Sequence, residues 1–256
     1  MITDLLLHTC LGLLLLLIPA GLLYLLERPM LKKLGFTILR MMIQLALLCL
    51  LVWALIKANS PGLMIIWLLA ISVYSGWIVM QRCKIPEALE VKLMLLVSVG
   101  LLIAVSLVGC WLLGLVFAVP VFTAHWFIPL TALLMGHATT MLIRGLSTYL
   151  SALQTDTEQI EFLQGNGVSP FKALLPFYRR SLLAILSPTM ANLTVLGLTS
   201  MPLLLIGLFM GGFSPIRAWI LMFGMVVGCV VTSVLALTLS IWFYELSQRH
   251  HRHPTA

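Results

Sequence analysis

The sequence predicts an all-α protein, a polytopic transmembrane helix bundle with about seven spans. Hydrophobic residues make up 61% of the chain and charged residues only 9%, whereas soluble domains are roughly 25% charged. Several apolar runs reach the roughly 20 residues that a helix needs to cross a bilayer. These leucine-dense runs do not alternate as the strands of a membrane barrel would. Lipid is therefore the expected solvent, and residues 1–256 are expected to form a single transmembrane domain.

Each predicted span is an apolar run bounded by polar or turn residues. The first run has no basic segment before it and is longer than the ~7–15 apolar residues of a signal peptide, so we expect it to be a retained helix. The predicted spans are approximately 5–26, 36–56, 61–80, 93–118, 126–143, 181–210 and 218–244.

The lysine and arginine residues predict the orientation, because cytoplasmic loops carry an excess of these residues. With seven spans, one side has only Lys57 and Arg217. The N-terminus is therefore expected outside and the C-terminus in the cytoplasm of a bacterial inner membrane. The net charge of +7 does not indicate nucleic acid, since the basic residues separate apolar runs instead of forming one stripe. The cytoplasmic side would hold Arg28, Lys32, Lys33, Arg40, Arg82, Lys84, Lys92, Arg144, Lys172, Arg179, Arg180, Arg249 and Arg252.

The sixth run is too long for a simple crossing. Residues 181–210 would extend ~45 Å as a helix, against a hydrocarbon core of ~30 Å. Proline interrupts helices, so we expect a kink or re-entrant turn near Pro202. Broken helices often line transport paths, which makes Asn192, Thr194, Thr199 and Pro202 candidate path residues.

Polar residues inside other spans are further candidates for a translocation path, because they are costly in lipid. Arg40 and Gln44 lie on one face of the second span, although Arg40 could extend to the headgroups and Gln44 could join two helices. His137 lies between Met135 and Met141 in the fifth span and is a candidate metal ligand. The structural alternative is a histidine hydrogen-bonded to a neighbouring helix.

The segment 147–180 is the longest polar stretch, and it falls on the predicted cytoplasmic side. Residues 147–164 have the apolar spacing of a helix that leaves the membrane. A short helix is expected next, before the chain returns to the membrane at Arg179-Arg180. Such a segment is either an ordinary amphipathic connector or an element on which a motor subunit acts.

The turn between these two helices contains residues that favour a helix end and a helix start. Gly165 and Gly167 are expected to end the first helix. Ser169 is a natural N-cap, and Pro170 suits the first position of the next helix.

A series of motifs extends over roughly residues 27–244: Arg40-x-x-Ile43-Gln44-Leu45, Ile128-Pro129 with Gly136, Glu161 with Gly165, Gly167-x-Ser169-Pro170-x-x-Ala173, Pro188-Thr189, Gly197-Leu198, Ser200-x-Pro202, Gly207 and Gly212-x-x-Pro215. In order and spacing they resemble the FetB (YbbM-like) family of ABC-transporter permeases, a family described as iron-export permeases.

This resemblance implies a permease subunit that works with a separate cytoplasmic ATPase and with a second copy of itself. ATP and Mg would bind to the ATPase, and this chain would bind no cofactor. The chain contains no GxxxxGK[ST] phosphate loop. The resemblance places ATPase coupling at Glu161, Gly165, Gly167, Ser169, Pro170, Lys172 and Ala173.

The substrate stays open, because polar positions inside the spans differ from the family pattern. His137 stands where the family has asparagine, and plant relatives are linked to aluminium tolerance and to UDP-glucose. Two other functions are considered: an ion-coupled secondary carrier, and a membrane scaffold without transport. A proton-coupled carrier needs a carboxylate inside the membrane, whereas Glu245 and the other candidates lie at span ends or in loops. An enzyme is not expected, since neither HExxH nor GxSxG occurs.

Overall fold

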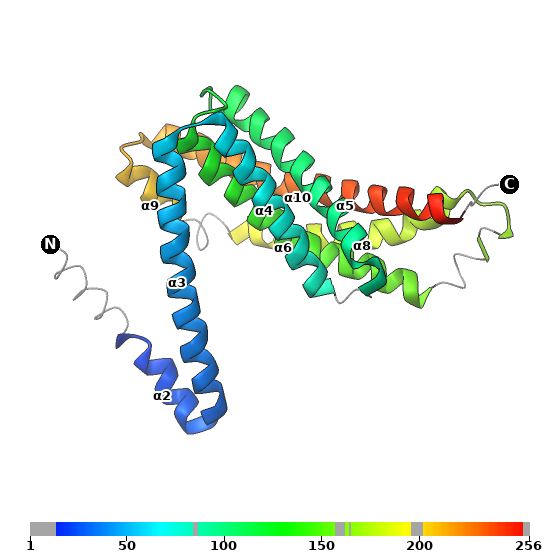
Figure 1. The fold of residues 1–256 in the computed structure, drawn as a ribbon, viewed down its shortest axis with the longest axis horizontal. Coiled ribbons are helices and arrows are strands. Elements are labelled where there is room, and N and C mark those ends of the chain that lie inside the picture. Colours follow the sequence, from blue (N-terminus) through cyan, green and yellow to red (C-terminus); the bar gives the residue numbers. More distant parts are fainter. Residues whose placement is uncertain (1–13, 84–86, 157–161, 164, 196–201, 253–256) are drawn as a thin grey trace. The chain divides into compact units, whose positions relative to one another are not determined.

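The computed structural model describes residues 14–83, 87–156, 162–163, 165–195 and 202–252. The secondary structure of these residues is helical, which confirms the all-α prediction for this part of the chain (Figure 1). The helices are α2 (Leu17–Leu26), α3 (Arg28–Ala58), α4 (Pro61–Cys83), α5 (Glu87–Trp111), the π-helix η1 (Leu112–Val116), α6 (Ala124–Thr155), α8 (Pro170–Val195), α9 (Pro202–Met210) and α10 (Pro215–Arg252).

Within the described residues, five helical stretches are long and apolar enough to cross a membrane. They match the second, third, fourth, fifth and seventh predicted spans. The first predicted span begins among residues 1–13, which are outside the described part, and α2 has only 10 residues. The count of seven and the orientation therefore stay predictions. The five stretches are Arg28–Ala58, Pro61–Cys83, Val91–Val116, Ala124–Thr155 and Pro215–Ser247.

The sixth predicted span corresponds to two described helices. Helix α8 ends at Val195 and α9 begins at Pro202. The kink or re-entrant turn expected near Pro202 falls partly on residues 196–201, which lie outside the described residues together with Thr199. With 9 residues, α9 rises only ~14 Å at 1.5 Å per residue.

Proline marks the start of four helices: α4 at Pro61, α8 at Pro170, α9 at Pro202 and α10 at Pro215. The first helical position suits proline because its missing N–H would have no partner inside the helix and its φ is already helical. Helix α3 ends just before Asn59, whose φ of 41° turns the chain into α4. The Asn59 Oδ1 atom accepts a hydrogen bond from the N–H of Ala124, the first residue of α6 (3.2 Å).

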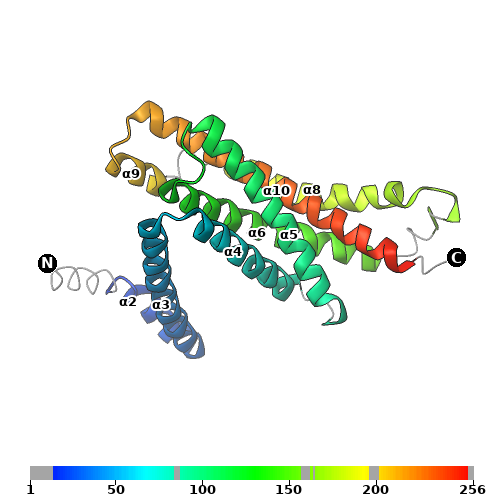
Figure 2. The same ribbon diagram turned by 45° about the horizontal axis from the view of Figure 1, so that its top comes forward.

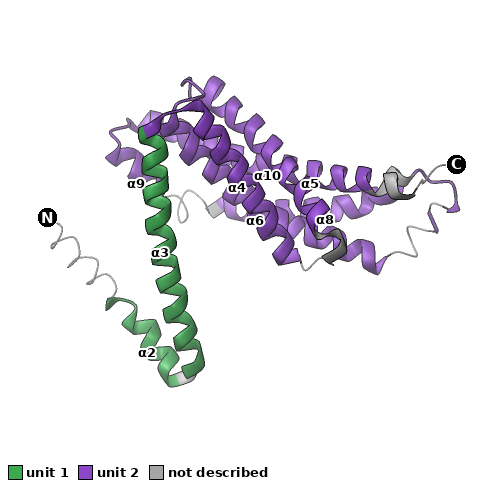
Figure 3. Ribbon diagram, viewed as in Figure 1, with its two compact units in different colours: residues 1–57 green, residues 58–256 purple. Residues whose placement is uncertain are grey.

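The chain divides into two compact units, residues 1–57 and 58–256 (Figure 3). The first unit holds α2 and nearly all of α3, and no residue of α3 is buried. In water this would expose a long apolar helix, so lipid is the natural surrounding for it. The second unit contains the helix bundle in which the packed core lies.

Helix α6 is the central element of the second unit. It packs against α4, α5, α8 and α10, as can be followed in Figures 1 and 2. Its fully buried side chains recur along one side of the helix, as the helical period requires. They include Ile128, Leu134, Leu142, Leu146 and Tyr149.

Small residues allow close approach between α4, α5 and α10. A β-carbon on Gly76 of α4 would lie 2.9 Å from the carbonyl oxygen of Met94 and would collide with Ser98 Oγ. A β-carbon on Gly100 of α5 would lie 2.9 Å from Ser240 Oγ of α10. Such contacts are typical of helix packing in membranes, where small residues let backbones approach. We call Gly76, Ser98, Gly100 and Ser240 the small-residue seam.

Candidate functional site

The predicted coupling segment connects α6 to α8. Helix α6 continues without interruption from the fifth predicted span to Thr155, so the helix expected to start at 147 is the extension of that span. Residues 157–161 and 164 lie outside the described part of the chain, and the candidate residue Glu161 is among them.

The glycine turn has the geometry that its sequence predicts. Gly167 has a φ of +80°, which side chains with a β-carbon rarely adopt. The N–H of Val168 donates to the carbonyl of Leu163 (3.1 Å), which closes the preceding helical turn. The N–H of Ala173 donates to the carbonyl of Ser169 (3.0 Å). Ser169 is therefore the N-cap by its backbone, and α8 begins at Pro170 as predicted.

Helix α8 corrects one expectation. A short helix was expected before Arg179-Arg180, but α8 continues through both arginines and through Pro176 to Val195. Packing explains the continuity, since a buried stripe repeats every four residues and holds the helix in place beyond the proline. The stripe consists of Ala173, Phe177, Ser181 and Ile185. A force applied near Lys172, which is exposed, therefore acts on the same helix that carries this stripe.

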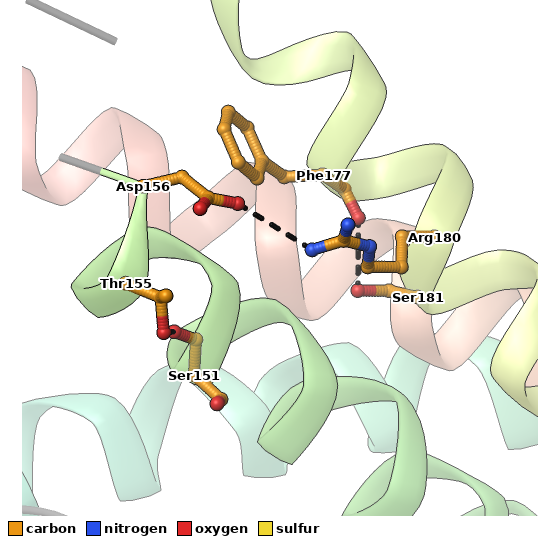
Figure 4. Close-up of polar contacts among 6 residues, drawn as sticks. All are labelled: Ser151, Thr155, Asp156, Phe177, Arg180 and Ser181. Carbon is orange, nitrogen blue, oxygen red and sulfur yellow. Dashed lines mark hydrogen bonds and ion pairs between the residues drawn. The ribbon is translucent and has the colours of Figure 1, made fainter. Parts of the chain in front are cut away.

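Three side-chain pairs join α6, α8 and α10 at the end of the bundle where α6 stops and α8 starts. We call this the loop end and the pairs the loop-end ties. Arg180 of α8 faces Asp156 at the end of α6, 3.4 Å away (Figure 4). The other two ties run to α10: Tyr149 Oη donates to Glu245 Oε1 (2.8 Å), and the hydroxyls of Tyr178 and Thr238 are 2.9 Å apart.

The sequence did not predict the Tyr149–Glu245 tie. Tyr149 is fully buried and Glu245 is half-buried, although Glu245 lies at the end of a predicted span. One signal was present: Tyr149 lies three residues after Leu146, on the apolar side of its helix. A polar tip on a buried face needs a partner.

His137 lies on α6 and contacts α10. Its Nδ1 atom is 3.0 Å from Ser233 Oγ. The Ser233 hydroxyl also lies 2.8 Å from the carbonyl of Cys229 in its own helix, to which it can donate. The contact between His137 and Ser233 is the helix–helix hydrogen bond that the sequence left open as the structural alternative. Within the described residues no group of three His, Cys, Asp or Glu side chains could hold a metal ion, and a metal role for His137 stays a prediction.

Four other candidates for a translocation path lie at exposed positions of two helices. Arg40 and Gln44 are exposed on α3, in the first unit. Asn192 and Thr194 are exposed on α8 in the second unit, where Thr194 donates to the carbonyl of Ala191 in its own helix (2.7 Å).

Comparison with known proteins identifies the family. A model of the uncharacterised protein family UPF0014 matches residues 6–247. The chain belongs to UPF0014. Protein ALUMINUM SENSITIVE 3 of Arabidopsis thaliana is 28% identical over 191 residues, which cover 73% of this chain and 67% of that protein.

Two other UPF0014 relatives are named as membrane proteins. STAR2 of Oryza sativa subsp. japonica is 30% identical over 128 residues, 47% of this chain and 44% of STAR2. The slr1647 protein of Synechocystis sp. is 25% identical over 187 residues, 72% of each chain. No solved structure matches. Family membership and the apolar helices agree that this chain is a membrane protein.

Proposed function

We propose that this UPF0014 chain is the permease subunit of an ABC transporter, which moves a small solute across the cytoplasmic membrane. ATP would be hydrolysed, with Mg, in a separate cytoplasmic subunit. Export is the proposed direction, and metal ions are the first substrate class to test. The chain itself would have no enzymatic activity.

The observation that carries this proposal is the continuity between the turn at residues 165–169 and the long helix α8, which begins directly after it. Gly167 and the Ser169-Pro170 start fix the turn, and α8 leaves it as one helix of 26 residues. The loop-end ties join α6 and α8 to α10. An ATPase that docks on the turn would therefore move whole helices, which is what mechanical coupling requires.

The charge pattern supports the placement of this turn in the cytoplasm. With seven crossings and the N-terminus outside, the basic residues gather on the side of the turn. An ATPase could then reach it. A second copy of the permease and two ATPases would complete a symmetric assembly.

Two observations guide the choice of substrate. The name of the Arabidopsis relative concerns aluminium, and His137 with Met135 and Met141 offers ligand types suited to softer metals. Aluminium is a hard cation, so the two observations favour different ions. Ferrous iron, aluminium and UDP-glucose are therefore compared in the test.

The test is co-purification of the tagged chain with an ATPase, followed by ATPase assays in reconstituted vesicles with each solute. A variant in which residues 165–169 are replaced by a flexible serine linker should lose both the ATPase partner and the stimulation. The same replacement at residues 211–214, between α9 and α10, is the matched control and should keep the ATPase partner. Failure to recover an ATPase, or full transport with the 165–169 linker, would overturn the proposal.

The Tyr149–Glu245 tie favours an ion-coupled carrier as the second candidate. Glu245 is a half-buried carboxylate on the same long apolar helix as the predicted seventh span. A carrier of this kind would transport without ATP and would respond to a proton gradient. Transport that stops with a protonophore and continues without ATP would favour the carrier over the ABC permease.

A further inference from the structure

The turn between α2 and α3 carries basic side chains close together (Figure 1). Arg28 begins α3, and Lys32 and Lys33 follow about one helical turn later. All three are exposed, and none of them takes part in an ion pair within the described part of the chain. Glu27 is the only acidic residue between positions 14 and 58, so positive charge is in excess here. We call Arg28, Lys32 and Lys33 the basic cluster.

The length of α3 indicates where the basic cluster lies. With 31 residues, α3 is about 46 Å long at 1.5 Å per residue, whereas the hydrocarbon core is about 30 Å thick. Lys57 closes the opposite end of the apolar run, and its Nζ atom lies 5.1 Å from the ring centroid of Trp53. A span of about 20 residues counted back from Lys57 ends near Thr37. The basic cluster therefore lies beyond the hydrocarbon core, at the level of the lipid headgroups.

An aromatic ring orients the first residue of the basic cluster. The Cζ atom of Arg28 lies 4.8 Å from the ring centroid of Tyr24 in α2, which is within the range of a cation–π interaction. The ring covers one face of the guanidinium group, so the N–H groups at its edge can still donate to an anion. Arg28 and Lys32 are four residues apart and thus neighbours on the helix surface. Two cations therefore converge on one side of α3, with Lys33 next to them.

Apolar side chains surround the basic cluster. Met30 is 46% exposed and Phe36 is 69% exposed. A soluble acidic partner would neutralise the basic groups but would leave these apolar side chains in water. A lipid surface offers phosphates to the basic groups and acyl chains to the apolar ones. An anionic lipid is therefore the partner that fits both features.

We propose that the basic cluster binds the headgroup phosphate of an anionic phospholipid. The Arg28 guanidinium group can donate two N–H groups to phosphate oxygens, and the ammonium groups of Lys32 and Lys33 add attraction. A zwitterionic lipid carries the same phosphate together with its own cation, so a headgroup of net negative charge is preferred. The proposal rests on membrane insertion of α3 and is independent of the proposed transport function.

The test is native mass spectrometry of the full chain released from maltoside micelles, with dioleoylphosphatidylglycerol or dioleoylphosphatidylcholine added at equal concentration. We expect the first phosphatidylglycerol to bind about tenfold more tightly than the first phosphatidylcholine. Free glycerol 3-phosphate has the phosphate without the acyl chains, and at the same concentration it should not displace the lipid. Equal binding of the two lipids, or displacement by glycerol 3-phosphate, would overturn the proposal.

Two triple variants with the same loss of charge locate the site. Replacement of the whole basic cluster by glutamine should reduce the preference for phosphatidylglycerol to about twofold, because each basic side chain near an anionic headgroup contributes to the attraction. The control replaces three exposed arginines of the second unit by glutamine and should keep the preference. A similar reduction in both variants would mean that only net charge matters, and would refute the site. The control substitutions are Arg82→Gln, Arg144→Gln and Arg179→Gln.

Further variants separate charge from folding. The exchange Arg28→Lys, Lys32→Arg and Lys33→Arg keeps the charge and should keep a preference of about fivefold or more. Lys57→Gln removes the cation of the Trp53 pair at the opposite end of α3 and should leave the preference unchanged. Thermal unfolding in the same micelles establishes that each variant is folded. Should the triple glutamine variant not fold, Lys32→Gln with Lys33→Gln takes its place and should reduce the preference to about threefold. An unchanged preference in the folded glutamine variant would refute the site.

Discussion

The loop end and the small-residue seam hold the same bundle together in opposite ways. At the loop end, α6, α8 and α10 are joined through side-chain tips, as in Tyr149–Glu245 and Tyr178–Thr238. In the seam, α4, α5 and α10 meet with almost no side chain between them, as at Gly76 and Gly100.

The difference matters for motion. A hydrogen bond between side-chain tips can be exchanged for one to water or to another residue, at a net cost of about 1 kcal/mol. A backbone contact through glycine has no such substitute, because any separation opens a void and any added atom collides. The side-chain contacts of the loop end can therefore exchange partners at a smaller cost than the contacts of the seam, which keep α4, α5 and α10 together.

The largest effect is expected in the seam. Gly76→Leu should destabilise the protein by about 3 kcal/mol, because its β-carbon already meets the Met94 carbonyl and Ser98. Gly136→Leu is the matched control, since no atom lies within 4 Å of a β-carbon there. Thermal unfolding in detergent micelles measures both. A similar decrease in the free energy of unfolding of the two variants would show that the close contact at Gly76 does not stabilise the bundle.

The second largest effect on the free energy of unfolding is expected at the buried Tyr149–Glu245 tie. Tyr149→Phe removes the hydrogen bond from the buried Tyr149 hydroxyl to Glu245 and should cost about 2 kcal/mol. Tyr74→Phe, on α4 and 54% exposed, should change the free energy of unfolding by less than about 0.5 kcal/mol. If Tyr149→Phe is as stable as Tyr74→Phe, the tie does not hold α10 to α6.

A smaller effect is expected in the turn that leads to α8. Gly167→Ala forces a β-carbon into a backbone with φ of +80° and should cost about 1 kcal/mol. The matched variant is Gly165→Ala, where no positive φ is present and no atom lies within 4 Å of the added carbon. ATPase stimulation in vesicles should fall in Gly167→Ala and persist in Gly165→Ala. The reverse order would show that the turn geometry does not matter for coupling.

The smallest effect is expected for the exposed ion pair. Arg180 is 64% exposed and lies 3.4 Å from Asp156, so water and salt screen the attraction. A double-mutant cycle of Arg180→Gln and Asp156→Asn should give a coupling below about 0.5 kcal/mol that decreases with added salt. A salt-independent coupling above about 1 kcal/mol would make this pair a structural element comparable to Tyr149–Glu245.

Local sequence predicted much of the fold. The apolar runs gave five of the stretches that are long enough to span, and the turn at Gly167 with the start at Pro170 followed from backbone chemistry alone. The length of α8 did not follow, because the buried stripe that carries the helix beyond Pro176 depends on what packs against it. The sequence also offered two interpretations of His137, a metal ligand and a helix–helix contact, and could not choose between them.

By itself the sequence determined which stretches are helical and where α8 starts, because helix propensity and the chemistry of a turn depend on neighbours a few positions apart. Only the tertiary structure decided the partners of the polar side chains. His137 bonds to Ser233 and Tyr149 to Glu245, and each pair is 96 residues apart in the chain. A polar residue in a membrane helix can contribute to a functional site or to a hydrogen bond between helices. Which of the two it does depends on the helix that packs against its face, and no local sequence pattern contains that information.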